Sequence, residues 1–272
     1  MFKYIDVHSH LNDKRYDSDI EEVLSRMRDA STASIVVGTD REMSERAIAL
    51  AEQNDDLWAS IGIHPTDQRS ESFDEVAYRK MAQHPRVVAI GECGIDYFRM
   101  ENFEGNKDRE ADRQQELIEQ HMDLAVAADK PLMIHGRPEK GSMDAYEDIL
   151  YILKSGHQQY GSKVRGNVHF FVGDTNITKQ FLDLGFTMSF TGVLTFAHDY
   201  DEVIRYIPLD MMHAETDAPY VAPLPYRGRR NEPAFVVETI RKIAELKGLT
   251  EIEVSTQLLR NAERMFGLPK FA

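Results

Sequence analysis

Residues 4–11 read YIDVHSHL, a short apolar run that ends in two histidines one residue apart. Such a run predicts a β-strand, in which residues i and i+2 point to the same side. His8 and His10 would then present two imidazoles to one point, which is how a strand offers nitrogen ligands to a metal ion. The same pair could equally be solvated imidazoles at the end of a surface strand, so the rest of the chain has to supply the other ligands.

The pattern of residues 4–11 recurs as short apolar or β-branched runs that alternate with longer charged stretches. Helical periodicity marks residues 42–52, 73–83 and 113–129 among those stretches. Further strands are predicted at residues 34–37, 58–61, 87–90, 131–134, 165–168, 186–190 and 211–214. About eight strand and helix units predict an α/β fold, a TIM-type (β/α)8 barrel with its active site at the carboxyl ends of the strands. A doubly wound open sheet is the alternative.

Length and composition fit one large globular domain. The chain has 272 residues, of which 42% are hydrophobic, and no repeat, low-complexity tract or linker divides it. We therefore expect residues 1–272 to form a single barrel domain. The formal net charge of −14 argues against a broad basic surface for nucleic acid, because Lys and Arg that neutralise phosphates supply most non-specific affinity. A local basic pocket, or a metal that meets a phosphate, remains compatible with this charge.

Cysteine usage and apolar runs indicate where the protein resides. Cys93 is the one cysteine, so no intrachain disulfide can form and a reducing compartment is the easier fit. The N-terminus lacks the apolar stretch of a signal peptide, and no apolar run approaches the ~20 residues needed to cross a bilayer. We expect a cytoplasmic protein that does not bind membranes.

Four further candidate ligands follow predicted strands. Glu92 ends the fourth strand, His135 the fifth and His169 the sixth, and Asp217 follows the eighth. Each has an ordinary alternative, such as a loop residue at a strand tip or an Asp in a Pro-containing turn. Those alternatives do not explain why all four, with the first two histidines, fall at the same ends of successive strands. In a barrel those ends surround one mouth, so six such side chains would suit a two-metal site for Zn, Mn or Mg.

Two connections are longer than a barrel needs. One runs from Gly94 to Asp112 and is rich in charge, and the other runs from Ala218 to Glu232 and is rich in Pro and Arg. Both follow predicted strands, and in a barrel such loops build the active-site face. They are candidates for substrate walls or a lid.

The chain resembles the TatD family of metal-dependent hydrolases, within the amidohydrolase superfamily of barrel enzymes. The matching stretches are residues 6–11 (DVHSHL), 60–65 (SIGIHP), 90–97 (IGECGIDY), 131–135 (PLMIH), 215–220 (ETDAPY) and 227–233 (RGRRNEP). This ordered set runs through nearly the whole chain. The pattern differs at residues 169–173 (HFFVG), where the family usually has a small or sulfur residue after the His and Ser or Thr before the Gly.

The resemblance implies a phosphodiester hydrolase, most often a deoxyribonuclease, here with 3'-5' exonuclease action on single-stranded DNA ends. It implies two divalent metal ions, one held by His8, His10 and Asp217 and the other by His135 and His169, with Glu92 as the bridge. In the implied mechanism the ions activate a water, and Asp217 accepts its proton. Glu92 is then a catalytic residue as well as a ligand.

The resemblance also suggests substrate contacts. His64 is similar to a family histidine that faces the site, where it would hydrogen-bond a phosphate or a metal-bound water; a capping role before Pro65 is the alternative. Arg227 and Arg230 would clamp a phosphate, unless they are part of a solvated surface cluster. Tyr97 is expected in a wall of the site.

The alternative function is that of an amidohydrolase acting on a small lactone, amide or phosphoester in the same pocket. Many enzymes of that superfamily bridge their metals with a modified Lys, whereas this chain offers Glu92 at the corresponding strand end. That difference favours the nuclease. A barrel that serves only as a scaffold is a third possibility, which the complete set of ligand residues disfavours.

Overall fold

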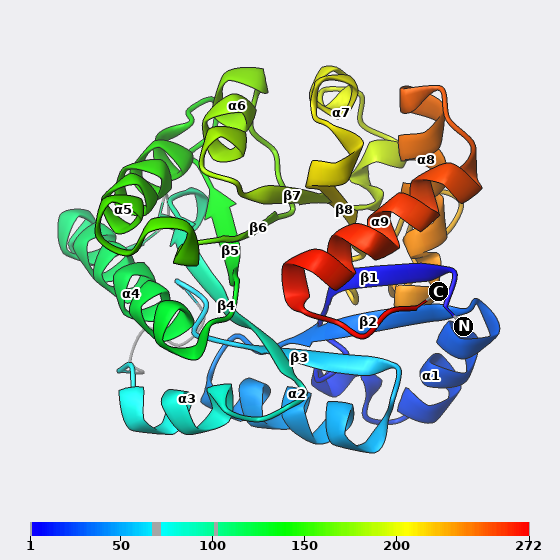
Figure 1. Cartoon of the computed structure of the whole chain (residues 1–272), viewed down its shortest axis with the longest axis horizontal. Coiled ribbons are helices and arrows are strands. Elements are labelled where there is room, and N and C mark those ends of the chain that lie inside the picture. The colour runs from blue at the N-terminus through cyan, green and yellow to red at the C-terminus, as the bar shows by residue number, and fades with distance from the viewer. Residues whose placement is uncertain (1, 67–71, 101–102, 272) are drawn as a thin grey trace.

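The computed structural model describes residues 2–66, 72–100 and 103–271 (Figure 1). Within this part of the chain, eight parallel strands form one sheet in the order β1 to β8. The strands are β1 (Tyr4–Ser9), β2 (Thr32–Val37), β3 (Leu57–Ile61), β4 (Val87–Asp96), β5 (Leu132–Arg137), β6 (Gly166–His169), β7 (Thr187–Phe190) and β8 (Met212–Ala214).

The first and last strands approach each other just beyond the end of β8. Ser9 and Ala218 form a parallel β-bridge. The backbone N–H of His10 donates to the oxygen of Ala218 at 2.7 Å, and that of Asp217 donates to the oxygen of His8 at 2.9 Å. The sheet is therefore a nearly closed (β/α)8 barrel, which confirms the predicted fold and excludes the open doubly wound sheet.

Most of the helices surround the strands on the outside of the barrel in Figure 1, whereas the last one lies across the barrel beside β1 and β8. The helices are α1 (Ile20–Asp29), α2 (Arg41–Gln53), α3 (Glu75–Ala82), α4 (Lys107–Ala128), α5 (Asp144–Tyr160), α6 (Thr175–Asp183), α7 (Asp201–Tyr206), α8 (Val236–Lys247) and α9 (Glu251–Phe266). Helix α1 shows how they form, because it buries Val23, Leu24 and Met27 on one face while acidic residues occupy its first turn and basic residues its last. Among the described residues, no helix has the length and apolar character that crossing a membrane requires.

Strand β4 extends farther than the sequence predicts, through Asp96 instead of ending at Glu92. Glu92 thus lies inside the strand, where the pairing with β5 shifts register between Ile90 and Cys93. Gly91 makes this irregularity possible. Its φ is +140°, and a Cβ there would lie 2.2 Å from the carbonyl oxygen of Met133.

The predicted long connection from Gly94 to Asp112 is mostly regular structure in the described residues. Strand β4 uses its first residues, the 3-10 helix η2 (Phe98–Met100) follows, and α4 begins at Lys107. The helix starts six residues before the predicted residue 113 because Asn106 caps it, accepting a hydrogen bond from the N–H of Arg109 at 3.0 Å. The remaining connection is short, although residues 101 and 102 lie outside the described part.

His121 of α4 fastens this helix to the segment that precedes His64. Its ring is fully buried, its Nε2 accepts the N–H of Ile63 at 3.0 Å, and its Nδ1 donates to the oxygen of Leu117 at 2.7 Å. Only a neutral ring can make both bonds, because Nε2 must accept. Burial, partly opposed by the bond to Leu117, lowers the pKa of His121 to about 4.

We expect His121 to make the fold sensitive to acid. Because the folded-state pKa lies below the unfolded value of about 6.5, the stabilisation is complete above pH 6.5 and is lost as the pH falls toward 4. At pH 5 the loss should be about 2 kcal/mol of the free energy of unfolding. Urea unfolding of wild type and His121→Gln at pH 7 and pH 5 checks this, since the variant should lose about 2 kcal/mol less between the two values. Equal losses in both proteins would contradict it.

Candidate metal centre

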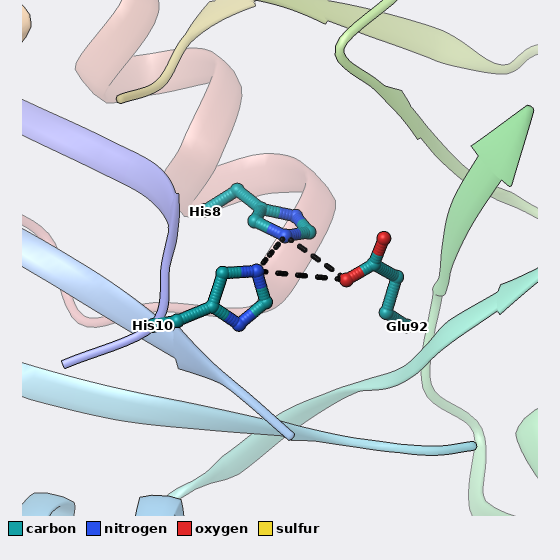
Figure 2. Close-up of side chains that lie close together, drawn as sticks. All are labelled: His8, His10 and Glu92. Carbon is teal, nitrogen blue, oxygen red and sulfur yellow. Dashed lines mark hydrogen bonds and ion pairs between the residues drawn. The ribbon is translucent and has the colours of Figure 1, made fainter. Parts of the chain in front are cut away.

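The carboxylate of Glu92 lies between two pairs of histidines. Its Oε2 is 3.4 Å from His8 Nε2 and 3.7 Å from His10 Nε2, and Figure 2 shows these three side chains pointing toward one another. Its Oε1 is 2.9 Å from both His135 Nδ1 and His169 Nε2. Each carboxylate oxygen therefore faces a different pair of ring nitrogens, which is the geometry of a bridging ligand.

Asp217 completes the first pair from the opposite side. Its Oδ1 lies 3.3 Å from His10 Nε2 and 3.9 Å from His8 Nε2. The residue has a φ of +53°, a left-handed conformation that non-glycine residues seldom adopt, and Asp is among those that tolerate it. Its carbonyl oxygen accepts the N–H of Tyr220 at 2.8 Å, which helps to hold this conformation. The structure thus brings all six predicted ligands together.

The spacing of the nitrogens fits divalent ions. His8 Nε2 and His10 Nε2 are 3.3 Å apart, and His135 Nδ1 and His169 Nε2 are 3.2 Å apart. A metal–nitrogen bond of about 2.0–2.1 Å places two ligands of one ion about 2.8–3.4 Å apart for angles between octahedral and tetrahedral values. Both pairs fall in that range, so the residues present suit one ion beside each pair.

In three of the histidines, the ring nitrogen that faces away from the candidate metal position has a hydrogen-bond acceptor, as is usual for histidines that bind metals. His10 Nδ1 lies 3.0 Å from the carbonyl oxygen of Val37, His135 Nε2 lies 3.2 Å from Asp96 Oδ2, and His169 Nδ1 lies 3.2 Å from Glu215 Oε1. An acceptor at one nitrogen keeps the proton there and leaves the other nitrogen free to bind a metal.

His8 differs from these three rings. Its Nδ1 is buried and has no hydrogen-bond partner among the described residues, so no acceptor there sets its tautomer. The ring instead stacks on that of His169, with centroids 3.8 Å apart and an angle of 13° between the planes. Packing therefore orients this candidate ligand.

Glu215 belongs to the candidate site although the sequence did not single it out. It is fully buried, and besides facing His169 it accepts hydrogen bonds from the N–H of Phe170 at 2.7 Å and from the hydroxyl of Ser189. These bonds fix the carboxylate that positions the His169 ring. The available signal was its place two residues before Asp217, in the segment that continues β8.

Asp6 lies on the strand that carries the first two histidines and bonds to Thr216 and His8. Its carboxylate accepts the N–H of Thr216 at 2.8 Å, the hydroxyl of Thr216 at 2.5 Å and the N–H of His8 at 3.2 Å. It therefore ties the segment before Asp217 to the strand that carries the first histidine.

The buried carboxylates and histidines stabilise each other's charges. Burial would raise the pKa of Glu92, but the charges of His169 and His64 and hydrogen bonds from His135 and His169 hold it well below the usual range. Burial likewise opposes a charged His10, yet the hydrogen bond to Asp217 and the charge of Glu92 raise its pKa to about 9. The carboxylates thus stay ionised and attract cations, whether protons or metal ions.

The hydrogen bonds of His64 leave one ring N–H directed toward the site. Its Nδ1 lies 3.3 Å from the backbone nitrogen of Thr66, whose N–H can only donate, so the proton of a neutral ring is at Nε2. That Nε2 is 3.6 Å from Glu92 Oε1. His64 is therefore placed to donate a hydrogen bond into the site, in agreement with its predicted position facing the site.

A cavity of about 670 Å³ opens above the cluster, at the carboxyl ends of the strands. His10, His64, Glu92, His135, His169 and Asp217 contribute to its lining. One wall of the cavity is formed by the segment after β4, with Phe98 and Arg99, and by the end of β5, with Arg137. The wall that follows β6, β7 and β8 is aromatic and aliphatic, with Phe170 and Tyr220 among its residues.

Three residues predicted as substrate contacts lie outside this lining. The hydroxyl of Tyr97 donates to Asp148 Oδ2 of α5 at 2.7 Å. Arg230 is paired with Asp19 at 2.5 Å, and Arg227 donates to the carbonyl oxygen of Ala222 at 2.9 Å. The polar group of each side chain is bonded to a residue outside the cluster, so the structure does not bring these three side chains to it. Two other arginines, those at 99 and 137, line the cavity instead.

Comparison with known proteins finds the same relationship along almost the whole chain. The family model "TatD related DNase" matches residues 5–267. The chain is 36% identical over 265 residues to the uncharacterized metal-dependent hydrolase YabD of Bacillus subtilis, covering 96% of this chain and 98% of that protein. It is 30% identical over 274 residues to a Pantoea ananatis protein named 3'-5' ssDNA/RNA exonuclease TatD, covering 97% and 99%.

Among solved structures, YjjV, a TatD homologue from Escherichia coli, superimposes with a TM-score of 0.86 at 27% sequence identity. The match covers 98% of this chain and 99% of that one. All six residues of the cluster lie inside residues 5–267, which the family model matches.

Proposed function

Because the chain belongs to the family of TatD-related DNases, which are metal-dependent hydrolases, we propose that it hydrolyses phosphodiester bonds of DNA with two divalent metal ions. The observation that carries the proposal is the position of Glu92, whose two oxygens face separate pairs of histidine nitrogens. One carboxylate shared by two ions about 3.5–4 Å apart suits the two-metal sites of nucleases and phosphatases.

In this proposal the six residues divide between two ions. His8, His10 and Asp217 would hold one ion, His135 and His169 would hold the other, and Glu92 would be shared. When bound, such a pair polarises phosphoryl oxygens and lowers the pKa of a coordinated water. Imidazole and carboxylate ligands suit Zn, Mn or Mg.

The protein's own groups then handle the proton and the substrate's charge. Burial would raise the pKa of Asp217, but its hydrogen bond to His10 and the charges of the nearby histidines lower it, so the carboxylate is ionised and can accept a proton from the attacking water. His64 Nε2–H donates to a non-bridging phosphate oxygen, whose negative charge grows in the transition state. Asp96 and Glu215 keep the rings of His135 and His169 in place.

We propose single-stranded DNA ends, cleaved from 3' to 5', as the substrate. A relative named 3'-5' ssDNA/RNA exonuclease supports this choice. The net charge of −14 disfavours a long basic track, whereas a strand end needs only local positive charge, which Arg137 supplies in the lining of the cavity. A cavity of about 670 Å³ has the size of a small-ligand pocket, which suits the end of a strand better than a duplex.

The proposal is tested by metal analysis combined with degradation of a 5'-labelled single strand. We expect two divalent ions per chain and stepwise shortening of the labelled strand from its 3' end. Excess chelator should abolish the activity, and added Mg, Mn or Zn should restore it, because the nucleophile depends on the ions. A panel of lactones and cyclic amides serves as the control. Full activity in excess chelator, or faster hydrolysis of a lactone or amide than of the strand, would overturn the proposal.

A further inference from the structure

Arg137 projects from the last position of β5 into the wall of the cavity. It follows His135 by two residues, and Gly136 between them faces outward, since a Cβ on it would meet the ring of Tyr146 at 2.4 Å. Residues i and i+2 of a strand share a face, so Arg137 and His135 both point to the barrel interior. The backbone is held by the bond from the N–H of Tyr97 to the oxygen of Arg137 at 2.9 Å.

The guanidinium of Arg137 has no carboxylate partner in the part of the chain that the structure describes. Most arginines of the described chain have a carboxylate oxygen within 4.0 Å, as Arg26 has in Glu232 and Arg230 in Asp19, but Arg137 has none among the described residues. Its Cζ instead lies 4.0 Å from the ring centroid of Phe98, and the side chain is half-buried. Because the ring covers one face, the N–H groups in the guanidinium plane stay available for an anion.

Arg99, the other arginine of the cavity, is already engaged. Its Nη1 donates to the hydroxyl of Thr66 at 2.9 Å, and its Nε lies 3.5 Å from Asp96 Oδ2. The charge of Arg99 is therefore largely offset within the protein, whereas that of Arg137 is not. In a chain with a net charge of −14, an uncompensated guanidinium in the cavity wall is suited to an anionic part of the substrate.

The position of Arg137 relative to the metal cluster suggests which anion it binds. Two strand residues span about 6.6 Å, so Arg137 lies about that far from His135 toward the mouth of the barrel. This is close to the separation of neighbouring phosphates in an extended polynucleotide chain. A phosphate at the Glu92 cluster would thus leave the next phosphate within reach of Arg137.

We propose that Arg137, held in place by Phe98, binds the phosphate next to the scissile one and so makes the enzyme selective for a polynucleotide over a simple phosphodiester. The inference rests on the proposed function, because it places the scissile phosphate at the Glu92 cluster. A guanidinium can bind phosphate through two parallel N–H bonds, which a lysine cannot reproduce.

The test compares two substrates with the metal-loaded protein. A single-stranded oligodeoxynucleotide carries neighbouring phosphates, whereas bis(p-nitrophenyl) phosphate has one phosphodiester and no second phosphate. We expect Arg137→Gln to lower kcat/KM for the oligonucleotide about 10- to 100-fold, mainly through KM, and to change that for bis(p-nitrophenyl) phosphate less than about twofold. The matched control is Arg260→Gln, on the exposed face of α9, where no carboxylate lies within 4.0 Å among the described residues; it should leave both values unchanged.

A binding measurement separates the effect of the positive charge of residue 137 from the effect of the guanidinium geometry. The holoenzyme is titrated with a fluorescent single strand whose phosphorothioate linkages resist cleavage, at several salt concentrations. For a single strand, losing one phosphate contact should reduce the slope of log K against log salt by about 0.7. Arg137→Gln should show this reduction, whereas Arg137→Lys should keep the slope while weakening binding.

The outcomes are distinct. Equal losses of Arg137→Gln on both substrates, no loss on the oligonucleotide, or an unchanged salt slope would overturn the role of Arg137 while leaving the hydrolase intact. If the metal-loaded wild type cleaves neither substrate, the proposed function itself fails, and the inference fails with it.

Discussion

Replacing Glu92 with Gln should reduce nuclease turnover by at least about 1,000-fold, and bound metal should fall from two ions to one or none. The reason lies in the symmetry of the site, where both oxygens of Glu92 face ring nitrogens at 2.9–3.7 Å. An amide has one acceptor oxygen, so its NH2 group would face one of the two histidine pairs and could not bind a cation there. Metal analysis and single-strand degradation measure the two effects.

A buried carboxylate outside the site provides the control for Glu92→Gln. Glu110 is 6% exposed and pairs with Arg113 at 2.8 Å, so Glu110→Gln makes the same chemical change away from the cluster. Both variants are followed by circular dichroism to establish that they fold. Glu92→Gln with two bound ions and full turnover would refute the bridging role, as would an equal loss of turnover in the folded Glu110→Gln protein.

Asp217→Asn should keep most of the bound metal but lose about 10²- to 10⁴-fold in kcat. Asn can still offer an oxygen to an ion, and like Asp it tolerates the left-handed backbone that a φ of +53° imposes. It cannot accept a proton from the attacking water. Turnover, metal content and the pH profile of kcat measure the separate contributions, and the acidic limb of the profile should change if this carboxylate is the base.

A second substitution at the same position separates the base from the ligand. Asp217→Gly also accepts the positive φ but removes both oxygens, so it should lose metal as well as turnover. Asp217→Asn with two bound ions and full turnover would reject the role of Asp217 as the base. If both variants lose metal to the same degree, the loss of turnover is explained by the role of Asp217 as a ligand, and no role as the base is needed.

The fold and the clustering of the six candidate ligands could be predicted from local patterns. Short apolar runs alternate with amphipathic helices, and a (β/α)8 barrel places the carboxyl end of every strand at one rim. His8, His135 and His169 are widely separated in sequence, yet each stands at such an end, so the topology alone brings them together. Strand boundaries were less predictable, because the extension of β4 past Glu92 depends on Gly91 and on pairing with β5.

The substrate-facing side chains could not be predicted in this way. Arg230 is in a motif of three arginines, but its guanidinium finds Asp19 from a segment 211 residues away. Tyr97 follows β4 directly, yet its hydroxyl reaches Asp148 on α5. A loop side chain turns toward whichever long-range partner packing provides, and no local pattern encodes that partner.

The sequence by itself determined the barrel and the six ligand types at its mouth, because strand periodicity and strand-end position are local properties that a closed parallel sheet converts into proximity. Only the tertiary structure decided which oxygen of Glu92 faces which histidines and that Asp96 and Glu215 hold the rings of His135 and His169. It also decided that Arg137 lines the cavity with no carboxylate oxygen within 4.0 Å among the described residues. These depend on register between neighbouring strands and on the burial of charges beside distant partners, which arise only when the chain is folded.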